Sequence, residues 1–233
     1  KEHLGDLCAT VTKEKADFGI VVDPDVDRLA FVDEKGQMFG EEYTLVACAD
    51  YVLSKTKGNT VSNLSSTRAL RVITEKHGGK YTAAAVGEVN VVVSMKAEKA
   101  VIGGEGNGGI IYPELHYGRD ALVGIALFLS HLADRQQSVS VLKASYPSFF
   151  MSKNKVTLKV GMDVDGILEK IKNVYIDQNP STIDGVKIDF DDRWIHLRKS
   201  NTEPIIRIYT EAPSQAVADG LAETVLNQIN TLI

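Results

Sequence analysis

The chain has 233 residues, 44% of them hydrophobic, and a formal net charge of -5. It is long enough for one large or two modest domains with a sizeable core. The negative charge argues against a nucleic-acid surface, which needs a clustered basic face. The sequence has neither an apolar run long enough to cross a membrane nor a signal-peptide pattern. Cys8 and Cys48 lie far apart without a C-x-x-C pattern, and two unpaired thiols favour a reducing, cytoplasmic location.

The first part of the chain alternates between apolar strands and helices with apolar residues at helical spacing. The predicted strands cover residues 18–22, 29–32, 60–64, 81–86, 100–103 and 110–112. The predicted helices cover residues 4–16, 41–54, 67–77, 88–99 and 120–135. Gly36 supplies the positive φ of a turn, and Asp120 stands near the positive end of the last helix. This alternation predicts a mixed α/β domain built from βαβ layers.

The pattern changes around residues 136–148, which are mostly polar, and we expect a domain boundary there. Beyond it the sequence predicts a strand at 155–160, a helix over 164–174, three short strands between 183 and 209, and a closing helix over 214–233. Strands followed by a packed helix predict a small α+β C-terminal domain, in which an antiparallel sheet carries helices.

The chain is organised around an apolar run at residues 19–22 and the acidic loop that follows it, Asp23-Pro24-Asp25-Val26-Asp27-Arg28. The run predicts a buried strand, and Pro24 ends it because proline cannot continue a central ladder. Three carboxylates on one short loop repel each other unless a cation lies among them. Their hard oxygen atoms favour Mg2+ or Ca2+. The predicted metal ligands are Asp23, Asp25 and Asp27.

Three other interpretations compete for the acidic loop. An ordinary solvated turn is less favoured at the end of a hydrophobic strand, where open α/β sheets place their ligands. An EF-hand is excluded because Arg28 stands where its sharp turn needs Gly, and because a strand precedes the loop. A phosphatase-type strand in which Asp23 takes up phosphate as an acyl phosphate stays open, although it leaves Asp27 and Arg28 unexplained.

Five glycines surround two polar side chains in the glycine-rich loop, residues 103–109. Such a loop is either a flexible hairpin tip or a place where a ligand approaches the backbone closely. If the backbone stays extended, Glu105 and Asn107 point the same way, and a carboxylate beside an amide suits sugar hydroxyls.

The phosphate loop, residues 198–204, lies between two apolar strands. Arg198 can bind a phosphate bidentately, and the turn supplies further donors from backbone N–H groups and polar side chains. Those side chains are Ser200, Asn201 and Thr202. The alternative is an ordinary hairpin with a basic rim. The density of donors around one arginine favours an anion site.

Taken in this order, the three loops resemble those of the α-D-phosphohexomutase family, which includes phosphoglucosamine mutases, phosphoglucomutases and phosphomannomutases. The acidic loop resembles the family's D-G-D-G-D-R metal loop, with Pro24 and Val26 in place of glycines. The glycine-rich loop resembles the G-E-x-S-G-H sugar loop, with Asn107 and Gly109 in place of Ser and His, a form similar to phosphoglucosamine mutases and archaeal-type enzymes. Residues 198–204 resemble the R-x-S-G/N-T-E-P phosphate loop.

The resemblance implies that residues 1–38, 39–146 and 147–233 correspond to the end of the family's second domain, its third and its fourth. It implies an isomerase of carbohydrate metabolism that moves phosphate between C6 and C1 of a hexose phosphate, through an enzyme phosphoserine and a hexose bisphosphate. Mg2+ would be held by the three aspartates, and Arg28 would steady the moving phosphoryl group. Glu105 and Asn107 would hold the sugar. The residues that would anchor the idle phosphate are Arg198, Ser200, Asn201 and Thr202.

The family's phosphorylated serine is absent, because the only Ser-His pair, Ser130-His131, lies in an apolar helix without a following Asn-Pro. The chain also begins on Lys1, so we expect a fragment that lacks the N-terminal domains of the same protein and has no mutase activity alone. Phosphoglucosamine mutase is the expected parent, with phosphoglucomutase/phosphomannomutase as the alternative. An aspartyl-phosphate hydrolase using Asp23, or a non-catalytic sugar-phosphate-binding module, would be less consistent with all three loops.

Overall fold

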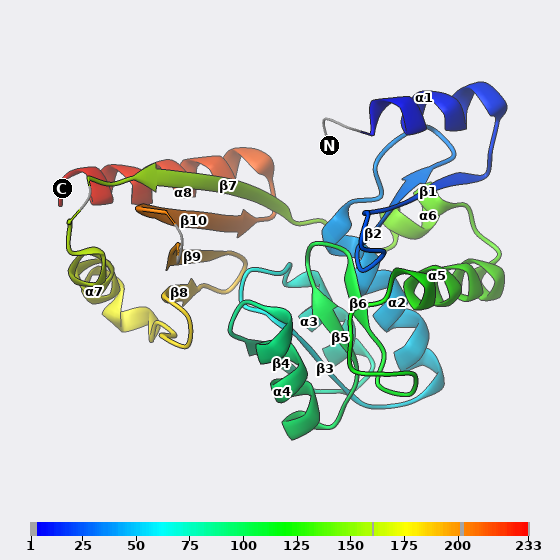
Figure 1. Cartoon of the computed structure of the whole chain (residues 1–233), viewed down its shortest axis with the longest axis horizontal. Coiled ribbons are helices and arrows are strands. Elements are labelled where there is room, and N and C mark those ends of the chain that lie inside the picture. The colour runs from blue at the N-terminus through cyan, green and yellow to red at the C-terminus, as the bar shows by residue number, and fades with distance from the viewer. Residues whose placement is uncertain (1–3, 160, 201–202, 233) are drawn as a thin grey trace. The chain divides into compact units, whose positions relative to one another are not determined.

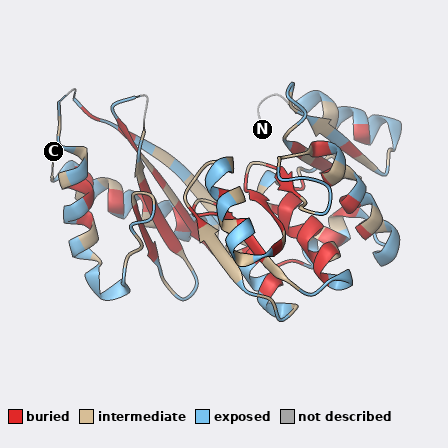
Figure 2. Ribbon diagram, turned by 60° about the horizontal axis from the view of Figure 1, so that its bottom comes forward, coloured by how far each residue is buried: buried red, intermediate tan, exposed pale blue. Residues whose placement is uncertain are grey.

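The computed structural model of the protein describes residues 4–159, 161–200 and 203–232. The chain divides into two compact units, Lys1–Pro147 and Ser148–Ile233. In each unit the buried residues gather on the strands and on the inward faces of the helices (Figure 2). The predicted fold class is confirmed, because the first unit contains a mixed sheet with parallel strands and the second an antiparallel sheet with helices.

The first unit begins with helix α1 (Gly5–Glu14) and an antiparallel hairpin of β1 (Phe18–Val22) and β2 (Leu29–Asp33) (Figure 1). Val22 pairs with Leu29, so the acidic loop is the connection between these two strands.

The prediction that β1 is a buried strand is wrong. Of its five residues only Gly19 is buried, whereas Ile20 and Val22 are each 37% exposed. Helix α1 packs on the Gly19 face, where Val11 and Leu7 lie close to the glycine. A sheet that has two strands in the described chain cannot bury both of its faces, so apolar composition alone overestimated the burial.

A four-stranded sheet with the order β4-β3-β5-β6 forms the centre of the first unit. The strand β3 (Asn59–Asn63) runs parallel to β4 (Tyr81–Ala84) and to β5 (Ala100–Glu105), and β6 (Gly109–Ile111) returns antiparallel to β5. The parallel pairs confirm the predicted βαβ units. The glycine-rich loop is therefore the hairpin between β5 and β6, at the end of a central strand.

Helices connect and cover these strands. They are α2 (Glu41–Lys55), α3 (Ala69–Lys76), α4 (Glu88–Glu98) and α5 (Ala121–Arg135). Helix α2 packs against α3 and α5, whereas α4 packs against β3 and β5. The Asp120 side chain accepts a hydrogen bond from the Val123 N–H, so it caps the N-terminus of α5 near which the sequence placed it.

The polar stretch before the second unit contains a helix that the sequence did not predict, α6 (Val139–Ala144). Its six residues are too few for a clear helical period, but Val139 and Leu142 are each 1% exposed and pack into the first unit. Glu34, from the turn after β2, accepts hydrogen bonds from the Ser140 N–H and hydroxyl and so ties α6 to the hairpin.

The second unit is a four-stranded antiparallel sheet with the order β7-β10-β9-β8. Its strands are β7 (Phe150–Thr157), β8 (Val186–Asp189), β9 (Trp194–Lys199) and β10 (Ile205–Ala212). Helix α7 (Val164–Val174) has the predicted bounds, η1 (Ile176–Gln178) follows it, and α8 (Gln215–Asn230) packs on β7 and β10. β7 begins earlier than predicted because Ala212 at the end of β10 pairs with Phe150.

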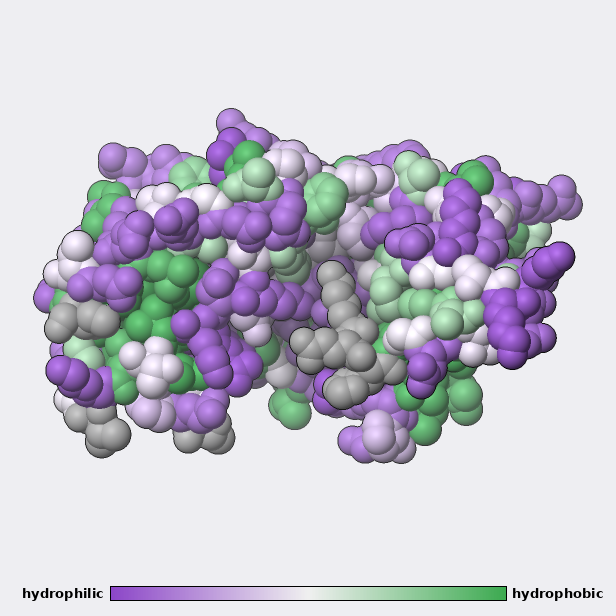
Figure 3. All heavy atoms as spheres, turned by 90° about the horizontal axis from the view of Figure 1, so that it is seen from above, coloured by the Kyte–Doolittle hydropathy of each residue, from purple (hydrophilic) through white to green (hydrophobic). Residues whose placement is uncertain are grey.

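The surface seen in Figure 3 is predominantly hydrophilic, with hydrophobic side chains gathered in separate patches. Some large hydrophobic residues are well exposed, for example Val89 and Val93 on α4 and Leu122 on α5. Among the described residues, no helix combines the length and the hydrophobicity that crossing a bilayer requires.

Candidate functional site

The acidic loop is folded around the first of its aspartates. Asp23 Oδ1 accepts hydrogen bonds from the backbone N–H of Asp27 at 3.2 Å and of Arg28 at 3.1 Å. The Val26 N–H donates to the Asp23 carbonyl at 3.0 Å, and Val26 adopts φ +56°, a left-handed conformation that a β-branched residue rarely takes. Asp23 thus organises the loop while its other oxygen, Oδ2, faces Arg28.

Two of the three predicted metal ligands converge. Arg28 Nε lies 3.4 Å from Asp23 Oδ2 and 3.6 Å from Asp27 Oδ1, so both carboxylates share one guanidinium. Asp25 is exposed at the tip of the loop. Within the part of the chain that the structure describes, no three His, Cys, Asp or Glu side chains are grouped so as to hold a metal ion.

The two converging carboxyl groups have opposite pKa shifts. Partial burial acts to raise the pKa of Asp23, but hydrogen bonds from the Arg28 and Asp27 backbone and the Arg28 charge hold that pKa below its ordinary value. Burial and the neighbouring Asp23 carboxyl group raise the pKa of Asp27, against the opposing charge of Arg119. Two carboxylates so close together repel each other when both are ionised, and a further cation would reduce this repulsion.

Two of the three predicted ligands, Asp23 and Asp27, offer oxygen atoms suited to a divalent cation. Asp27 Oδ1 is a buried carboxylate oxygen without a hydrogen-bond donor. An oxygen in that state costs free energy unless a cation or a donor reaches it. Asp23 Oδ2 and Asp27 Oδ1 both border Arg28, and they supply the hard oxygen atoms that Mg2+ prefers.

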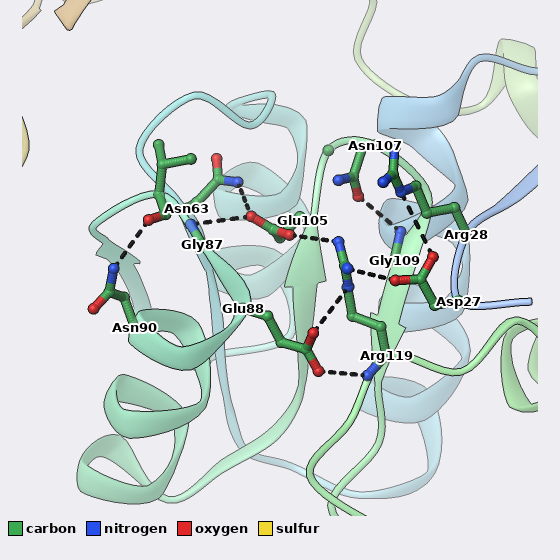
Figure 4. A network of polar contacts seen from close by, with 12 residues as sticks. Asp27, Arg28, Asn63, Gly87, Glu88, Asn90, Glu105, Asn107, Gly109 and Arg119 are labelled. Atoms are coloured by element: carbon green, nitrogen blue, oxygen red, sulfur yellow. Dashed lines mark hydrogen bonds and ion pairs between the residues drawn. The ribbon is translucent and has the colours of Figure 1, made fainter. Parts of the chain in front are cut away.

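The glycine-rich loop is a tight hairpin tip, not an extended segment. Residues 106–108 form its turn, and Asn107 Oδ1 accepts from the Gly109 N–H at 3.1 Å. The extended backbone that would aim Glu105 and Asn107 in one direction is therefore absent (Figure 4). Two of the glycines allow close packing within the protein, since a Cβ on Gly106 would overlap Glu42 and one on Gly108 would overlap the Leu29 backbone.

Glu105 is 5% exposed and fully engaged by other residues of the protein. Its Oε1 accepts from Asn63 Nδ2 at 2.8 Å and from the Gly87 N–H at 3.3 Å, and its Oε2 lies 3.0 Å from Arg119 Nη1. A polar ligand in this place would therefore join an existing network at the carboxyl end of β5.

Arg119 is the residue of this site that the sequence interpretation missed. Its guanidinium pairs with Asp27 of the acidic loop, with Glu88 at the start of α4 and with Glu105 of the glycine-rich loop (Figure 4). The sequence shows Arg119 only as the residue before a helix cap, and its partners are distant in the chain. Three carboxylates around one arginine bring the two loops of the first unit together.

The phosphate loop belongs to the second unit. Arg198 lies near the end of β9 with Nη1 3.7 Å from Asp184 Oδ2, and the Ser200 N–H donates to the Ile205 carbonyl at 3.0 Å. The predicted ligands Asn201 and Thr202 lie outside the described residues. The described part thus brings Arg198 and Ser200 to the same turn, beside a half-buried carboxylate.

Other residues that could act as reactive groups make contacts typical of a structural role. Ser130 Oγ donates to the Ala126 carbonyl within α5, and His131 is buried against Tyr146 and Asp50. Burial raises the pKa of Cys48 to about 12, which makes this thiol a poor nucleophile. An aspartyl-phosphate hydrolase would also need a lysine downstream of Asp23. Lys187 is a poor candidate for it, because it is 5% exposed and lies over the Trp194 ring in the second unit.

A βαβ sheet with a glycine-rich hairpin after β5, a separate β1–β2 hairpin that carries the acidic loop, and a second antiparallel unit define a multidomain α/β protein. The chain matches three family models of phosphoglucomutase/phosphomannomutase. The model of alpha/beta/alpha domain II matches residues 1–36, and that of alpha/beta/alpha domain III matches residues 40–149. The model of the C-terminal domain matches residues 153–228. The chain belongs to the phosphohexomutase family.

Curated relatives agree with this assignment. The chain is 33% identical to a probable phosphoglucosamine mutase of Methanopyrus kandleri over 95% of its length and 50% of that protein. It is 36% identical to a phosphoglucosamine/phosphogalactosamine mutase of Sulfurisphaera tokodaii, over 94% of this chain and 50% of that protein. The chain therefore spans about half the length of the curated relatives it matches.

Solved structures show the same fold. A phosphoglucomutase/phosphomannomutase family protein from Burkholderia thailandensis superposes with a TM-score of 0.83 at 24% identity, over 99% of this chain and 50% of that one. An Aspergillus fumigatus N-acetylphosphoglucosamine mutase, solved in complex with GlcNAc-6P and magnesium, superposes with a TM-score of 0.64 at 16% identity, with 90% and 51% covered.

Proposed function

We propose that this chain is the part of a phosphohexomutase that holds the metal, the sugar and the idle phosphate, and that the whole protein is a phosphoglucosamine mutase. The reaction moves phosphate between C6 and C1 of a hexose phosphate, through a phosphoserine outside this chain and a hexose bisphosphate. The observation that carries the proposal is the meeting of the acidic loop and the glycine-rich loop at Arg119. Relatives named phosphoglucosamine mutase support glucosamine phosphate as substrate, whereas a 34% identical relative of Thermococcus kodakarensis is named phosphoglucomutase/phosphomannomutase.

In this proposal Asp23 and Asp27, joined by the exposed Asp25, hold Mg2+. The ion would supply Lewis acidity at the phosphoryl group that is transferred. Arg28, which already borders both Asp23 and Asp27, would stabilise negative charge that develops as the phosphoryl group moves. The Arg28 backbone N–H donates to Asp23, which holds the Arg28 main chain beside the proposed metal site.

Glu105 and Asn107 would hydrogen-bond the sugar hydroxyls. The side-chain amide of Asn107 lies at the hairpin tip, half-buried, while Glu105 offers its carboxylate from within the network. The residues that would anchor the idle phosphate are Arg198, Ser200, Asn201 and Thr202. A distal anchor combined with hydroxyl contacts that work in either orientation lets both monophosphates bind, which a reversible C1–C6 transfer requires.

The test is a steady-state assay of the full-length protein with the 6-phosphates of glucosamine, glucose and mannose. We expect kcat/KM to be highest with glucosamine 6-phosphate. Asp27→Asn should reduce kcat at least about a hundredfold, since it removes a charged ligand from the transferring group. Asp17→Asn, at an exposed position before β1, is the matched control.

Absence of turnover by the full-length protein on all three sugars would contradict the proposed function. Turnover by the 233-residue chain alone would contradict the assignment of the phosphoserine to a segment outside it. The proposal includes a cytoplasmic, metabolic role without a nucleic-acid or membrane partner.

A further inference from the structure

Arg119 is placed where it can act on both loops of the proposed active site. It is 16% exposed at its side chain and lies between carboxylates from three separate elements. Nη2 faces Asp27 in the acidic loop, and Nη1 lies 3.0 Å from Glu105 at the end of β5. The two terminal nitrogen atoms of one guanidinium thus each pair with a carboxylate of a different loop (Figure 4).

Glu88 fixes the base of this guanidinium independently of the acidic loop. Its Oε1 accepts from the Arg119 backbone N–H at 3.1 Å, and its Oε2 lies 3.2 Å from Arg119 Nε. Glu88 therefore holds Arg119 near the start of α4 through one backbone hydrogen bond and one ion pair, although Arg119 Nε itself makes no hydrogen bond. Losing Asp27 would therefore leave Arg119 bound to Glu88 and Glu105.

Asp27 is the carboxylate with an unsatisfied oxygen. Its Oδ2 pairs with Arg119, whereas its Oδ1 is buried without a hydrogen-bond donor and lies 3.6 Å from Arg28 Nε. A divalent cation that coordinates Asp27 would come within a few ångströms of the Arg119 charge. At such distances two positive charges in a partly buried site repel strongly.

We propose that Arg119 is the counter-ion of Asp27 when no metal is bound, and that a divalent cation competes with its guanidinium for this carboxylate. The displaced guanidinium stays with Glu88 and Glu105, so that metal binding at the acidic loop changes the electrostatics of the glycine-rich loop. This inference rests on the proposed function in one respect, which is that Asp27 is a metal ligand. Competition is reciprocal, so weakening the Arg119–Asp27 pair strengthens metal binding.

The first experiment measures Mn2+ binding by electron paramagnetic resonance, which needs no substrate and no activity. Arg119→Gln removes the charge and keeps hydrogen-bonding capacity, and we expect it to bind Mn2+ about tenfold more tightly than the wild type, within the range of a partly buried ion pair. Arg119→Lys keeps the charge and should stay within about twofold of the wild type. Arg71→Gln, which removes an arginine paired with Glu75 on the surface of α3, is the control for net charge.

A positioning role without competition predicts the opposite sign, because a loosened Asp27 would bind the ion more weakly. Weaker or unchanged Mn2+ binding by Arg119→Gln, with the wild type binding normally, overturns this inference and leaves the proposed function intact. Failure of the wild type to bind Mn2+ overturns both this inference and the metal role of the acidic loop.

The second experiment uses the wild type and so does not depend on whether a variant folds. Titration with Mg2+ is followed by NMR at two backbone amides, that of Arg28, which donates to Asp23, and that of Gly87, which donates to Glu105. Competition predicts that both signals shift with the same midpoint, because the released arm of Arg119 changes the charge around Glu105. A shift at Arg28 without one at Gly87 would overturn the coupling between the loops.

Discussion

The two units stabilise their interiors by different means. The first unit buries a charged cluster around Asp50, which is 3% exposed on α2. Its carboxylate lies 2.7 Å from His77, 3.0 Å from Arg135 and 3.2 Å from His131, and accepts from the Tyr146 hydroxyl at 3.3 Å. Burial opposes ionisation, but these donors and charges hold the pKa of Asp50 well below its ordinary range.

The second unit is built on an aliphatic core. Valine, leucine and isoleucine side chains from its sheet and from α7 and α8 form one buried cluster. The sheet of this unit also buries polar side chains, which are Lys187, His196, Thr210 and Glu211. Burial lowers the pKa of His196 to about 4, so it is neutral at pH 7, and its Nε2–H donates to the Asp184 carbonyl at 2.7 Å.

The difference follows from what each unit supports. Hydrophobic contacts are non-directional and suffice to hold an antiparallel sheet against its helices. Ion pairs and hydrogen bonds have fixed geometry, and the first unit uses them twice, at Asp50 to join helices and at Arg119 to join two loops. Four substitutions test this contrast.

Asp50→Ala should cost the first unit about 2–4 kcal/mol, because it leaves the buried His131 and Tyr146 side chains without their carboxylate acceptor and breaks the ion pair with Arg135. The measurement is urea unfolding followed by far-UV circular dichroism. Asp134→Ala is the matched control, since that aspartate makes an exposed ion pair with Lys55 and should cost less than about 1 kcal/mol. Equal costs for the two variants would mean that the charged cluster is not a structural centre of the first unit.

Ile171→Ala should cost the second unit about 2–5 kcal/mol, since the side chain is fully buried in the aliphatic cluster and its removal leaves a cavity. Fluorescence of Trp194 reports this unit, because it is the chain's one tryptophan and is buried there. Ile176→Ala, at a 54% exposed position in η1, should stay within about 0.5 kcal/mol of the wild type. A small loss for Ile171→Ala would show that the apolar core is not what stabilises the second unit.

Glu34→Gln should cost about 1–2 kcal/mol at pH 7, as it weakens charge-assisted hydrogen bonds to Ser140. Although burial opposes it, these hydrogen bonds lower the pKa of Glu34 from 4.5 to about 2. The folded state therefore binds its proton less readily than the unfolded state. The stabilisation is fully present above pH 4.5 and is lost as the pH falls towards 2.

Urea unfolding of the wild type and Glu34→Gln at several pH values checks this prediction, and the two stabilities should converge at the acidic end. Glu75→Gln, on the exposed face of α3, gives the effect of the same change at a surface ion pair. A difference between wild type and Glu34→Gln that does not change with pH would contradict an ionic contribution from Glu34.

Val26→Gly should stabilise the first unit by about 0.5–1 kcal/mol. Glycine relieves the strain of a β-branched residue in the left-handed region, and this gain exceeds the extra conformational entropy that glycine loses on folding. The control is Val22→Gly in the extended strand β1, which should destabilise by about the same amount. Thermal unfolding of the two variants measures the sign. Destabilisation by Val26→Gly would indicate that the valine side chain makes a compensating contact.

Most of the local elements and the three loops could be predicted from the sequence, although helix α6 could not. β1 and α7 have the predicted bounds, and Pro24, Gly36 and Asp120 act where they were expected, in a turn, at positive φ and as a helix cap. These features depend on backbone sterics and on residues a few positions apart, so they can be read from a short window. Each loop motif also spans only a few consecutive residues, so the resemblance to the family is visible in the sequence without a structure.

Only the tertiary structure decided which charges meet. Arg119 reaches Asp27 and Glu105 because the β5–β6 hairpin and the β1–β2 hairpin fold against each other, with the Leu29 N–H donating to the Gly108 carbonyl at 3.1 Å. The exposure of β1 likewise depended on how many strands join its sheet. Coulomb and packing energies depend on distance in space, and no spacing along the chain encodes that distance for residues so far apart.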